Sequence, residues 1–203
     1  MKVLFLSNNP AVSGPLSDWL SGRGCVVRTW EGVLVPEALA SDMPEWIISY
    51  NYRHIVKSDV LRMLPGRVIN LHISLLPWNR GADPNLWSFL EDTPKGVSIH
   101  LIDTGLDTGP LIAQRKMNFD PLKETLATSY SKLHAEIQAL FRESWDMLLA
   151  GKMPGQSQQS GGSFHTMKDS VGLKLKLGPD YLEVSCAELV QRYAGLKGRG
   201  ECK

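Results

Sequence analysis

Several features that mark secreted, membrane-bound or nucleic-acid-binding proteins are missing from this sequence. It has three cysteines (Cys25, Cys186 and Cys202), an odd number without a Cys-x-x-Cys spacing, which argues against a disulfide framework and a zinc cage. No apolar stretch approaches the run of about 18 residues that crosses a bilayer. The 22 basic and 21 acidic residues leave a formal net charge of +1, without the basic excess that binds nucleic acid. We therefore expect no membrane or nucleic-acid partner and, because the cysteines fit a reducing compartment, a cytoplasmic protein.

The first half of the chain alternates short apolar runs with helical stretches. Hydrophobic residues make up 43% of the 203 positions, enough for a core of ordinary size. The opening run KVLFL ends in the turn cluster SNNP, which is typical of a buried first strand and not of a secretory signal. Such an alternation favours an α/β fold with a doubly wound, mostly parallel sheet and flanking helices. Strands are predicted at residues 2–6, 25–27, 46–50 and 67–71, and short helices at 16–20 and 58–64.

The second half changes character. Strands predicted at 97–102 and 111–119 are joined by the turn-rich loop DTGLDTGP. A long amphipathic helix is expected over residues 121–150, because apolar residues recur there at the three- and four-residue spacing of one buried face. Residues 155–163 are rich in Gly, Ser and Gln, which predicts a flexible loop.

The end of this long helix is the natural point at which to divide the chain. Gly and Pro residues follow it and stop the helical pattern. We therefore predict a main domain over residues 1–150 and a short C-terminal extension over 151–203. The extension is expected to hold a small strand at 171–177 and a helix at 186–195.

Two polar residues, Asn70 and His72, stand at the carboxyl end of a predicted strand. Because they are two positions apart, their side chains share one face of the strand. The carboxyl ends of strands in an open α/β sheet are where ligands bind. A histidine in such a place can equally serve to satisfy a hydrogen bond within the fold. The pairing with Asn70 and the turn that follows favour the functional interpretation.

A second polar cluster is the glycine-rich loop that holds Asp103 and Asp107. Two carboxylates four positions apart could serve acid–base chemistry or bind a cation. Asp-x-Gly is also ordinary turn chemistry, so the loop by itself could be a plain connection. Calcium is disfavoured because the loop lacks further oxygen ligands at regular spacing.

Taken together, these stretches resemble a known family. The succession Asn-x-His-x-Ser-Leu-Leu-Pro (70–77), Gly-Val-Ser-Ile-His (96–100) and Asp-x-Gly-x-Asp-Thr-Gly-Pro (103–110) is similar to that of the formyltransferases that use N10-formyltetrahydrofolate. The resemblance extends over the predicted main domain and is strongest from Val68 to Gln114. It implies a Rossmann-like fold and a formyl transfer from N10-formyltetrahydrofolate to an amine, without a metal.

The resemblance also assigns roles to individual residues. It implies that Asn70, His72 and Asp107 are catalytic, and the chemistry agrees with these residue types. The attacked carbonyl becomes an oxyanion, which the Asn70 amide and a His72 N–H can stabilise. Asp107 can manage the proton transfers and orient His72. His100, on the strand before the loop, is interpreted as a supporting residue. Folate-binding residues are implied at Tyr52, Arg53, His54 and Ile55, and at Asp103, Thr104, Gly105 and Leu106.

The segment PWNRGADPNLWS, directly after the catalytic strand, resembles the sugar N-formyltransferase branch of this family. Arg80 has the forked, permanent charge that suits a diphosphate, and Trp78 offers a flat face to a base or sugar. The alternative is that Trp78 and Trp87 are core residues and that Arg80 forms a surface ion pair. Pro10 removes a donor N–H from the first loop, which weakens a phosphate-binding role there. Substrate-binding residues are predicted at Asn8, Asn9, Trp78, Asn79, Arg80, Gly81 and Asn85.

The sequence therefore predicts an enzyme that formylates the primary amine of an amino sugar, with a nucleotide-linked sugar as its small-molecule partner and N10-formyltetrahydrofolate as its co-substrate. The branch implies lipopolysaccharide O-antigen biosynthesis and leaves a homodimer open. Fewer residues follow the long helix than make up the C-terminal domain of transfer RNA formyltransferases, so transfer RNA is not expected as a substrate. The alternatives are a 10-formyltetrahydrofolate hydrolase, a formyltransferase for another small amine, and a non-catalytic folate-binding module.

Overall fold

The structure is a computed structural model, described for residues 1–200, and Cys202 lies outside them. The strands are β1 (Lys2–Leu6), β2 (Val26–Trp30), β3 (Trp46–Tyr50), β4 (Val68–His72), β5 (Arg80–Gly81), β6 (Lys95–Leu101), β7 (Leu111–Met117) and β8 (Phe164–His165). The helices are α1 (Pro10–Gly22), α2 (Glu37–Ala40), α3 (Ser58–Met63), α4 (Pro84–Leu90), α5 (Leu126–Leu149), α6 (Met167–Leu177) and α7 (Cys186–Gly198). Within residues 1–200, no helix is both long and apolar enough to cross a membrane.

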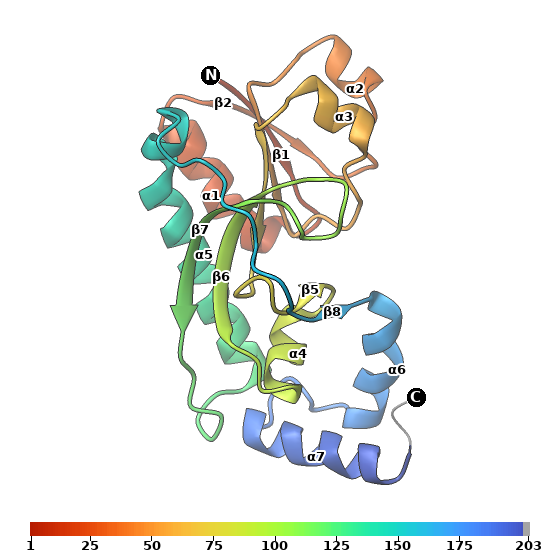
Figure 1. Ribbon diagram of the computed structural model, residues 1–203. Coiled ribbons are helices and arrows are strands. Elements are labelled where there is room, and N and C mark those ends of the chain that lie inside the picture. Colours follow the sequence, from red (N-terminus) through yellow and green to blue (C-terminus); the bar gives the residue numbers. More distant parts are fainter. Residues whose placement is uncertain (201–203) are drawn as a thin grey trace. The chain divides into compact units, whose positions relative to one another are not determined.

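Six strands form one twisted sheet in the order β2-β1-β3-β4-β6-β7 (Figure 1). β1 pairs in parallel with both β2 and β3, and β3 pairs in parallel with β4. The chain leaves β2 at one edge and returns past β1 to β3, so a topological switch point lies between β1 and β3. A second, two-stranded sheet pairs β5 with β8 in parallel. The predicted Rossmann-like, mostly parallel α/β sheet is confirmed.

Alternate residues of β1 are buried on opposite faces of the sheet. Leu4 and Leu6 join one hydrophobic cluster with side chains from α2 and α3. Phe5, between them, lies edge-on to Tyr50, whose hydroxyl is 3.4 Å from the side-chain nitrogen of Gln138 in α5. Helices therefore cover both faces of this strand. Burial on both sides explains why KVLFL is continuously apolar instead of alternating.

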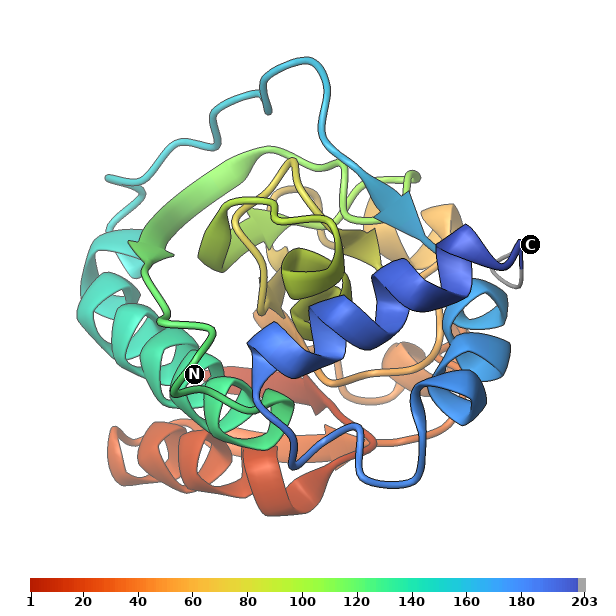
Figure 2. The same ribbon diagram turned by 90° about the horizontal axis from the view of Figure 1, so that it is seen from below.

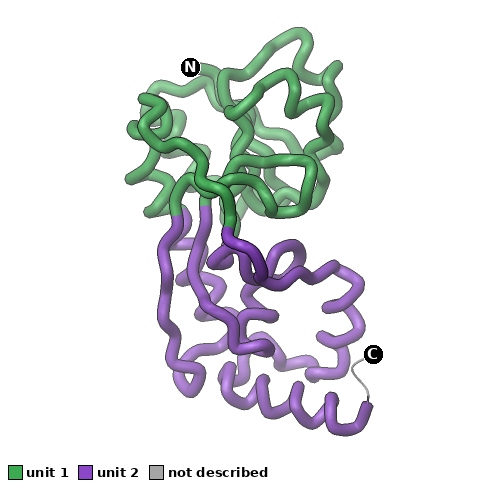
Figure 3. Tube along the Cα trace, viewed as in Figure 1, with its two compact units in different colours: residues 1–72, 99–113, 138–158 green, residues 73–98, 114–137, 159–203 purple. Residues whose placement is uncertain are grey.

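The chain forms two compact units, which Figure 3 colours separately. Residues 1–72, 99–113 and 138–158 make up unit 1, and the other described residues make up unit 2. Strands β6 and β7 and helix α5 contribute residues to both units. Each unit draws on residues from both sides of position 150, and the domain boundary predicted there stays a prediction.

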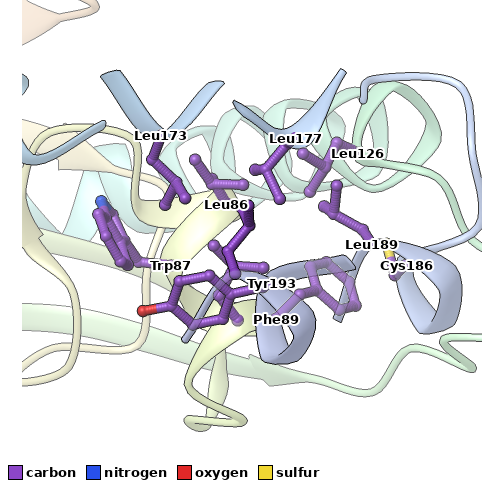
Figure 4. Packing of buried hydrophobic residues seen from close by; sticks show 11 residues of the cluster. Leu86, Trp87, Phe89, Leu126, Leu173, Leu177, Cys186, Leu189 and Tyr193 are labelled. Carbon is purple, nitrogen blue, oxygen red and sulfur yellow. The ribbon is translucent and has the colours of Figure 1, made fainter. Parts of the chain in front are cut away.

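Unit 2 has its own hydrophobic cluster, in which α4, α6 and α7 meet (Figure 4). Helix α7 packs against both α4 and α6, as Figure 2 shows. Leu86 of α4 belongs to this cluster together with Leu173 of α6 and Leu189 of α7. Burying one such leucine stabilises the fold by roughly 1.5–3 kcal/mol, so tertiary packing holds these helices in place. The helix predicted at 186–195 is confirmed as α7.

The strand predicted at 171–177 is wrong, because this stretch is part of helix α6. The letters LKLKL alternate as they would in a half-buried strand. In the structure, Leu173 and Leu177 are buried, whereas Leu175 between them is 82% exposed. A four-residue spacing of buried side chains is the period of a helix. A capping box at the start of α6 fixes its first turn.

The long amphipathic helix is confirmed as α5, although it begins at Leu126 and not near residue 121. The preceding residues form turns, in which the Asp120 carboxylate accepts a hydrogen bond from the Leu122 N–H (3.1 Å). Such local bonding between an aspartate and the backbone competes with the helix. This competition explains the later start.

The loop predicted to be flexible at 155–163 is anchored at both ends. Gln156 exchanges two main-chain hydrogen bonds with Leu111 at the start of β7. Near the other end, the main-chain oxygen of Ser163 accepts the Arg80 N–H (3.0 Å). The composition predicted a loop correctly but gave no sign of these long-range bonds.

Candidate active site

The three residues predicted to be catalytic converge within unit 1. Asn70 and His72 come from β4, and Asp107 from the loop between β6 and β7. Nδ2 of Asn70 lies 3.1 Å from Oδ1 of Asp107 and 3.2 Å from Nε2 of His100, at the end of β6. These partners are 37 and 30 residues away from Asn70 in the chain. The sheet therefore brings an amide, a carboxylate and two imidazoles into one cluster.

His100 fixes the orientation of Asn70. Nδ1 of His100 lies 2.8 Å from the main-chain oxygen of Leu101, which can only accept, so this nitrogen carries the proton. Nε2 is then an acceptor for one N–H of Asn70, while the other N–H bonds to Asp107. Both amide hydrogens are engaged in this arrangement. Asn70 must therefore exchange one of these bonds in order to donate to an oxyanion.

His72 faces the same carboxylate as Asn70. Nδ1 of His72 is 3.7 Å from Oδ2 of Asp107, beyond hydrogen-bond length but close enough for electrostatic coupling. The two side chains are only 8% and 11% exposed, so solvent screens this coupling weakly. A small movement or one bridging water would let Asp107 exchange a proton with His72.

The loop that carries Asp107 is held by its own residues. Oδ1 of Asp103 accepts hydrogen bonds from the Gly105 N–H (3.0 Å) and the Thr108 hydroxyl (2.7 Å). Asp107 has φ = +53°, in the left-handed region. Gly109 has no room for a side chain, because a Cβ there would lie 1.8 Å from a main-chain oxygen. The side chain of Asp103 thus shapes the loop.

Among residues 1–200, no group of three or more His, Cys, Asp or Glu side chains could hold a metal ion.

Gln158 reaches the same loop from the segment after α5. Its Nε2 donates to the main-chain oxygens of Asp107 (2.8 Å) and Gly109 (2.9 Å). These two bonds hold the backbone on both sides of Thr108, where Asp107 has its left-handed conformation. Gln158 is therefore a positioning residue for the carboxylate. Sequence reasoning missed it, because one glutamine in a Gly/Ser/Gln-rich stretch carries no signal that separates it from its neighbours.

Tyr52 ties the predicted folate-binding segment after β3 to the loop that follows β2. Its hydroxyl donates to the Gly32 oxygen (2.5 Å) and accepts the Leu34 N–H (3.1 Å), and burial raises the pKa of this hydroxyl. Ile55 of this segment and Leu106 of the other predicted segment are 67% and 42% exposed. These two apolar side chains are therefore available to a flat aromatic ring, while Tyr52 supports the scaffold.

Asn8 and Asn9 shape the loop after β1. The Asn8 amide donates to the Glu31 oxygen (2.8 Å) and accepts the Arg53 N–H (2.9 Å), which ties this loop to the segment after β3. Asn9 precedes α1, and its main-chain oxygen accepts the Ser13 hydroxyl (2.9 Å). Both ends of the Asn8 side chain are used within the scaffold, which argues against the direct substrate contact predicted for it.

Asn79 and Asn85 build unit 2 in the same way. Asn79 is fully buried, and its side chain bonds to the hydroxyls of Thr93 (2.8 Å) and Ser163 (3.1 Å). Asn85 is also buried and donates to the Leu126 oxygen (3.0 Å). These bonds occupy the polar groups that substrate recognition would need. These bonds tie both side chains to the scaffold of unit 2, and the substrate contacts of Asn79 and Asn85 stay predictions.

The remaining predicted acceptor residues lie on or next to the short β5–β8 sheet. Gly81 has φ = +87°, and a Cβ there would lie 2.2 Å from the His165 oxygen, so only glycine fits. Trp87 stacks on the His165 ring at 3.9 Å with an interplanar angle of 7°, which confirms the core alternative for this tryptophan. Arg80 and Trp78 are half-buried. They stay the candidates for acceptor binding.

Comparison with known proteins identifies the family. A family model described as formyl transferase matches residues 34–143, more than half of the chain. The matched stretch contains Asn70, His72, His100 and Asp107, the whole polar cluster described above. The chain belongs to the formyl transferase family.

Individual relatives agree with this assignment. The crystal structure of the formyltransferase PseJ from Anoxybacillus kamchatkensis, which holds UDP-4,6-dideoxy-4-formamido-L-AltNAc and tetrahydrofolate, is similar over 100% of both chains, with 39% identity and a TM-score of 0.86. A 4-N formyltransferase from Francisella tularensis shares the fold, with 19% identity and a TM-score of 0.74 over 95% of this chain and 87% of its own. Methionyl-tRNA formyltransferase from Myxococcus xanthus is 34% identical over 158 residues, 76% of this chain and 50% of the relative. The chain thus spans half the length of that curated relative.

Gln158→Ala is expected to lower the kcat of formyl transfer about 5- to 150-fold, since two hydrogen bonds of about 0.5–1.5 kcal/mol each position the Asp107 backbone. KM for the formyl donor and the Tm should change little. The exposed neighbour offers a matched control, and Gln159→Ala should leave kcat within about twofold. Steady-state kinetics across pH make the check, because displacement of Asp107 should also shift the pH profile of kcat. Equal losses in the two variants would refute the positioning role.

Proposed function

We propose that this protein transfers the formyl group of N10-formyltetrahydrofolate to the primary amine of a nucleotide-linked amino sugar. The observation that carries the proposal is the convergence of Asn70, His72 and Asp107 at the end of β4. The similarity to PseJ over the full length of both chains supports the acceptor class, because that protein holds a UDP-linked formamido sugar and tetrahydrofolate.

The residues of the cluster divide the chemistry among them. An N–H of His72, and one of Asn70 once it leaves its present partner, would donate to the oxygen of the formyl group as negative charge builds there. Asp107 would accept the proton that the amine loses when its nitrogen bonds to the formyl carbon. That proton would then return to N10 of the folate as the old carbon–nitrogen bond breaks. The donor supplies the activated formyl carbon, and the side chains supply hydrogen bonds and proton transfer.

The chemistry of the two segments of unit 1 that are predicted to bind folate supports the proposed donor. Exposed Ile55 and Leu106 provide apolar contact for a flat ring, and the backbone of residues 103–107 is rigidly bonded through Asp103. Main-chain groups in such rigid loops can hydrogen-bond the polar edge of a pterin without losing side-chain entropy. Tyr52, Arg53, His54, Thr104 and Gly105 stay predicted contributors to this site.

The alternatives keep the same catalytic residues and change the acceptor. A hydrolase would pass the formyl group to water, and another transferase would use a different small amine. Transfer RNA is disfavoured because the net charge of +1 gives no general attraction for nucleic acid. The cytoplasmic location, the homodimer and a role in lipopolysaccharide O-antigen biosynthesis stay predictions.

An acceptor assay tests the proposal. The purified protein is incubated with N10-formyltetrahydrofolate and a UDP-linked 4-amino-4,6-dideoxy sugar, and the formamide is measured by mass spectrometry. We expect product that depends on the nucleotide sugar, and little formate when no acceptor is present. Formate release at the same rate with and without acceptor would favour the hydrolase. Faster formylation of hydroxylated ornithine than of the nucleotide sugar would favour the other small amine.

Arg80→Ala is expected to raise KM for the nucleotide sugar about 10- to 150-fold. This factor corresponds to the loss of one partly desolvated, charged hydrogen bond, which contributes about 1.5–3 kcal/mol. The reason is that a guanidinium fork pairs with diphosphate oxygens, and Arg80→Lys keeps the charge without the fork. KM for the folate donor should barely change. Arg142→Ala, at an exposed position of α5, is the control. If Arg80→Ala weakens donor binding and spares the acceptor, Arg80 belongs to the folate site or the scaffold.

A further inference from the structure

Helix α6 presents a stripe of apolar side chains to solvent. Met167, Val171 and Leu175 are 62%, 54% and 82% exposed. They follow one another at a four-residue spacing and therefore share one face of the helix, while Leu173 and Leu177 occupy its buried face. Both views place α6 at the outer edge of unit 2 (Figure 1 and Figure 2). Single exposed apolar side chains are ordinary, whereas a contiguous stripe indicates a contact surface.

A groove borders this stripe at the carboxyl end of α6, with a volume of about 480 Å³. The ammonium of Lys174 in its wall is paired with Oδ1 of Asp83 at 2.6 Å, so the groove offers mainly apolar contact. The side chains that line it come from α6 and the loop that follows: Val171, Lys174, Leu175, Gly178, Pro179 and Tyr181. One surface of unit 2 therefore carries both projecting apolar side chains and a recess for such side chains.

The middle of the stripe leaves room for the backbone of another helix. Gly172 follows Val171 and lies on the exposed side of α6. A Cβ at this position would meet no atom within 4 Å, so packing inside unit 2 does not require a glycine there. Glycine destabilises the interior of a helix relative to alanine. Its presence beside the stripe permits a close approach, since the distance between packed helices depends on the side chains at the contact.

The charges of α6 match those of a second α6 that runs in the opposite direction. Asp169 lies in the first turn and Lys176 in the last turn. They are about two turns apart and therefore stand on one flank of the stripe. In an antiparallel pair, each Asp169 would lie opposite the Lys176 of the other copy, and the two helix dipoles would be opposed. An anionic membrane surface fits less well, because it would repel the Asp169 carboxylate.

We infer that two copies of this chain associate through α6 about a twofold axis. Val171 of each copy would meet its equivalent at the axis, with Gly172 beside it. Because the helices run antiparallel, the flexible Met167 of each copy would enter the groove at the carboxyl end of the other α6. Such an isologous interface uses the same surface twice and closes after two copies. The inference goes beyond the proposed function and gives α6, within the C-terminal extension, a role in assembly.

Sedimentation velocity of the 203-residue chain over a wide range of protein concentration tests the inference. One helix and one loop from each copy make a small contact, so we expect reversible association in which the mass rises from 22.5 kDa toward twice this value. Val171→Glu places two like charges at the axis and should raise the Kd of the dimer at least about tenfold. Lys176→Glu sets carboxylates against each other and should raise this Kd at least about threefold, with a smaller effect at high salt.

Two exposed positions outside α6 and its groove provide matched controls. Leu122 is 76% exposed, and Lys152 is also exposed. Leu122→Glu and Lys152→Glu should leave the Kd of the dimer within about twofold. The Tm of all four variants should match that of the parent protein, because each substitution replaces an exposed side chain.

A parent protein that stays at 22.5 kDa at every concentration would overturn the inference. A dimer with the same Kd in the folded Val171→Glu and Lys176→Glu variants would also overturn it, because its interface would lie elsewhere. Flotation with vesicles of anionic phospholipid examines the membrane alternative. Vesicle binding by a monomeric parent protein that Val171→Glu abolishes would assign the stripe to a lipid surface and reject the second copy. None of these measurements involves formyl transfer, so failure of the proposed function and failure of this inference are separate results.

Discussion

Asp107→Asn is expected to lower kcat at least about 100-fold, within the range for a general acid–base residue, while the fold stays intact. The carboxylate accepts the Asn70 N–H at 3.1 Å and lies 3.7 Å from Nδ1 of His72 and 3.4 Å from Nε2 of His100. An asparagine cannot accept the proton of the attacking amine. It also cannot accept hydrogen bonds at both ends of its side chain, because one of the two ends is a donor.

The measurement is single-turnover formyl transfer with saturating donor and acceptor, together with the Tm. The exposed Asp18 offers a matched control, and Asp18→Asn should keep full activity. Turnover near that of the parent protein in a well-folded Asp107→Asn variant would remove this carboxylate from the catalytic set. Binding of tetrahydrofolate should survive the substitution, since the loop bonds run through Asp103, Thr108 and Gln158.

The second large effect concerns Asn70 and His72 as a pair. Each single alanine variant is expected to lose about 100- to 1,000-fold in kcat, the range for removing one donor to a developing oxyanion. The double variant should be little worse than the poorer single one, because residues that act as a unit are coupled. The structure strengthens this expectation, since both side chains face the Asp107 carboxylate.

A double-mutant cycle on kcat makes the comparison. The combination of His72→Ala with Arg80→Ala is the control, because Arg80 is proposed to act on acceptor binding, and the effects of this pair on kcat/KM should multiply. Strictly multiplicative losses for Asn70→Ala with His72→Ala would assign the two residues separate roles. A loss of Tm that parallels the loss of rate would instead point to a structural contribution.

The strands of the sheet and the shared face of Asn70 and His72 could be predicted from local patterns in the sequence. Apolar runs and turn clusters are local signals, so β1, β3 and β4 could be placed from the letters of each run alone. The spacing of Asn70 and His72 puts both side chains on one face by the geometry of any strand. The resemblance then connected this strand to the loop of Asp107, which no local pattern could do.

Which polar residues face one another, and which bond within the scaffold, depends on contacts between distant segments that no local pattern carries. His100 and Gln158 reach the catalytic cluster across 30 and 51 residues of chain, whereas Asn79 is taken up by bonds to Thr93 and Ser163. An asparagine has the same letter in either role, because its hydrogen-bond partners come from distant segments. The stretch LKLKL became a helix for a related reason: local alternation favours a strand, and the packing of Leu173 and Leu177 in the unit 2 cluster outweighs it.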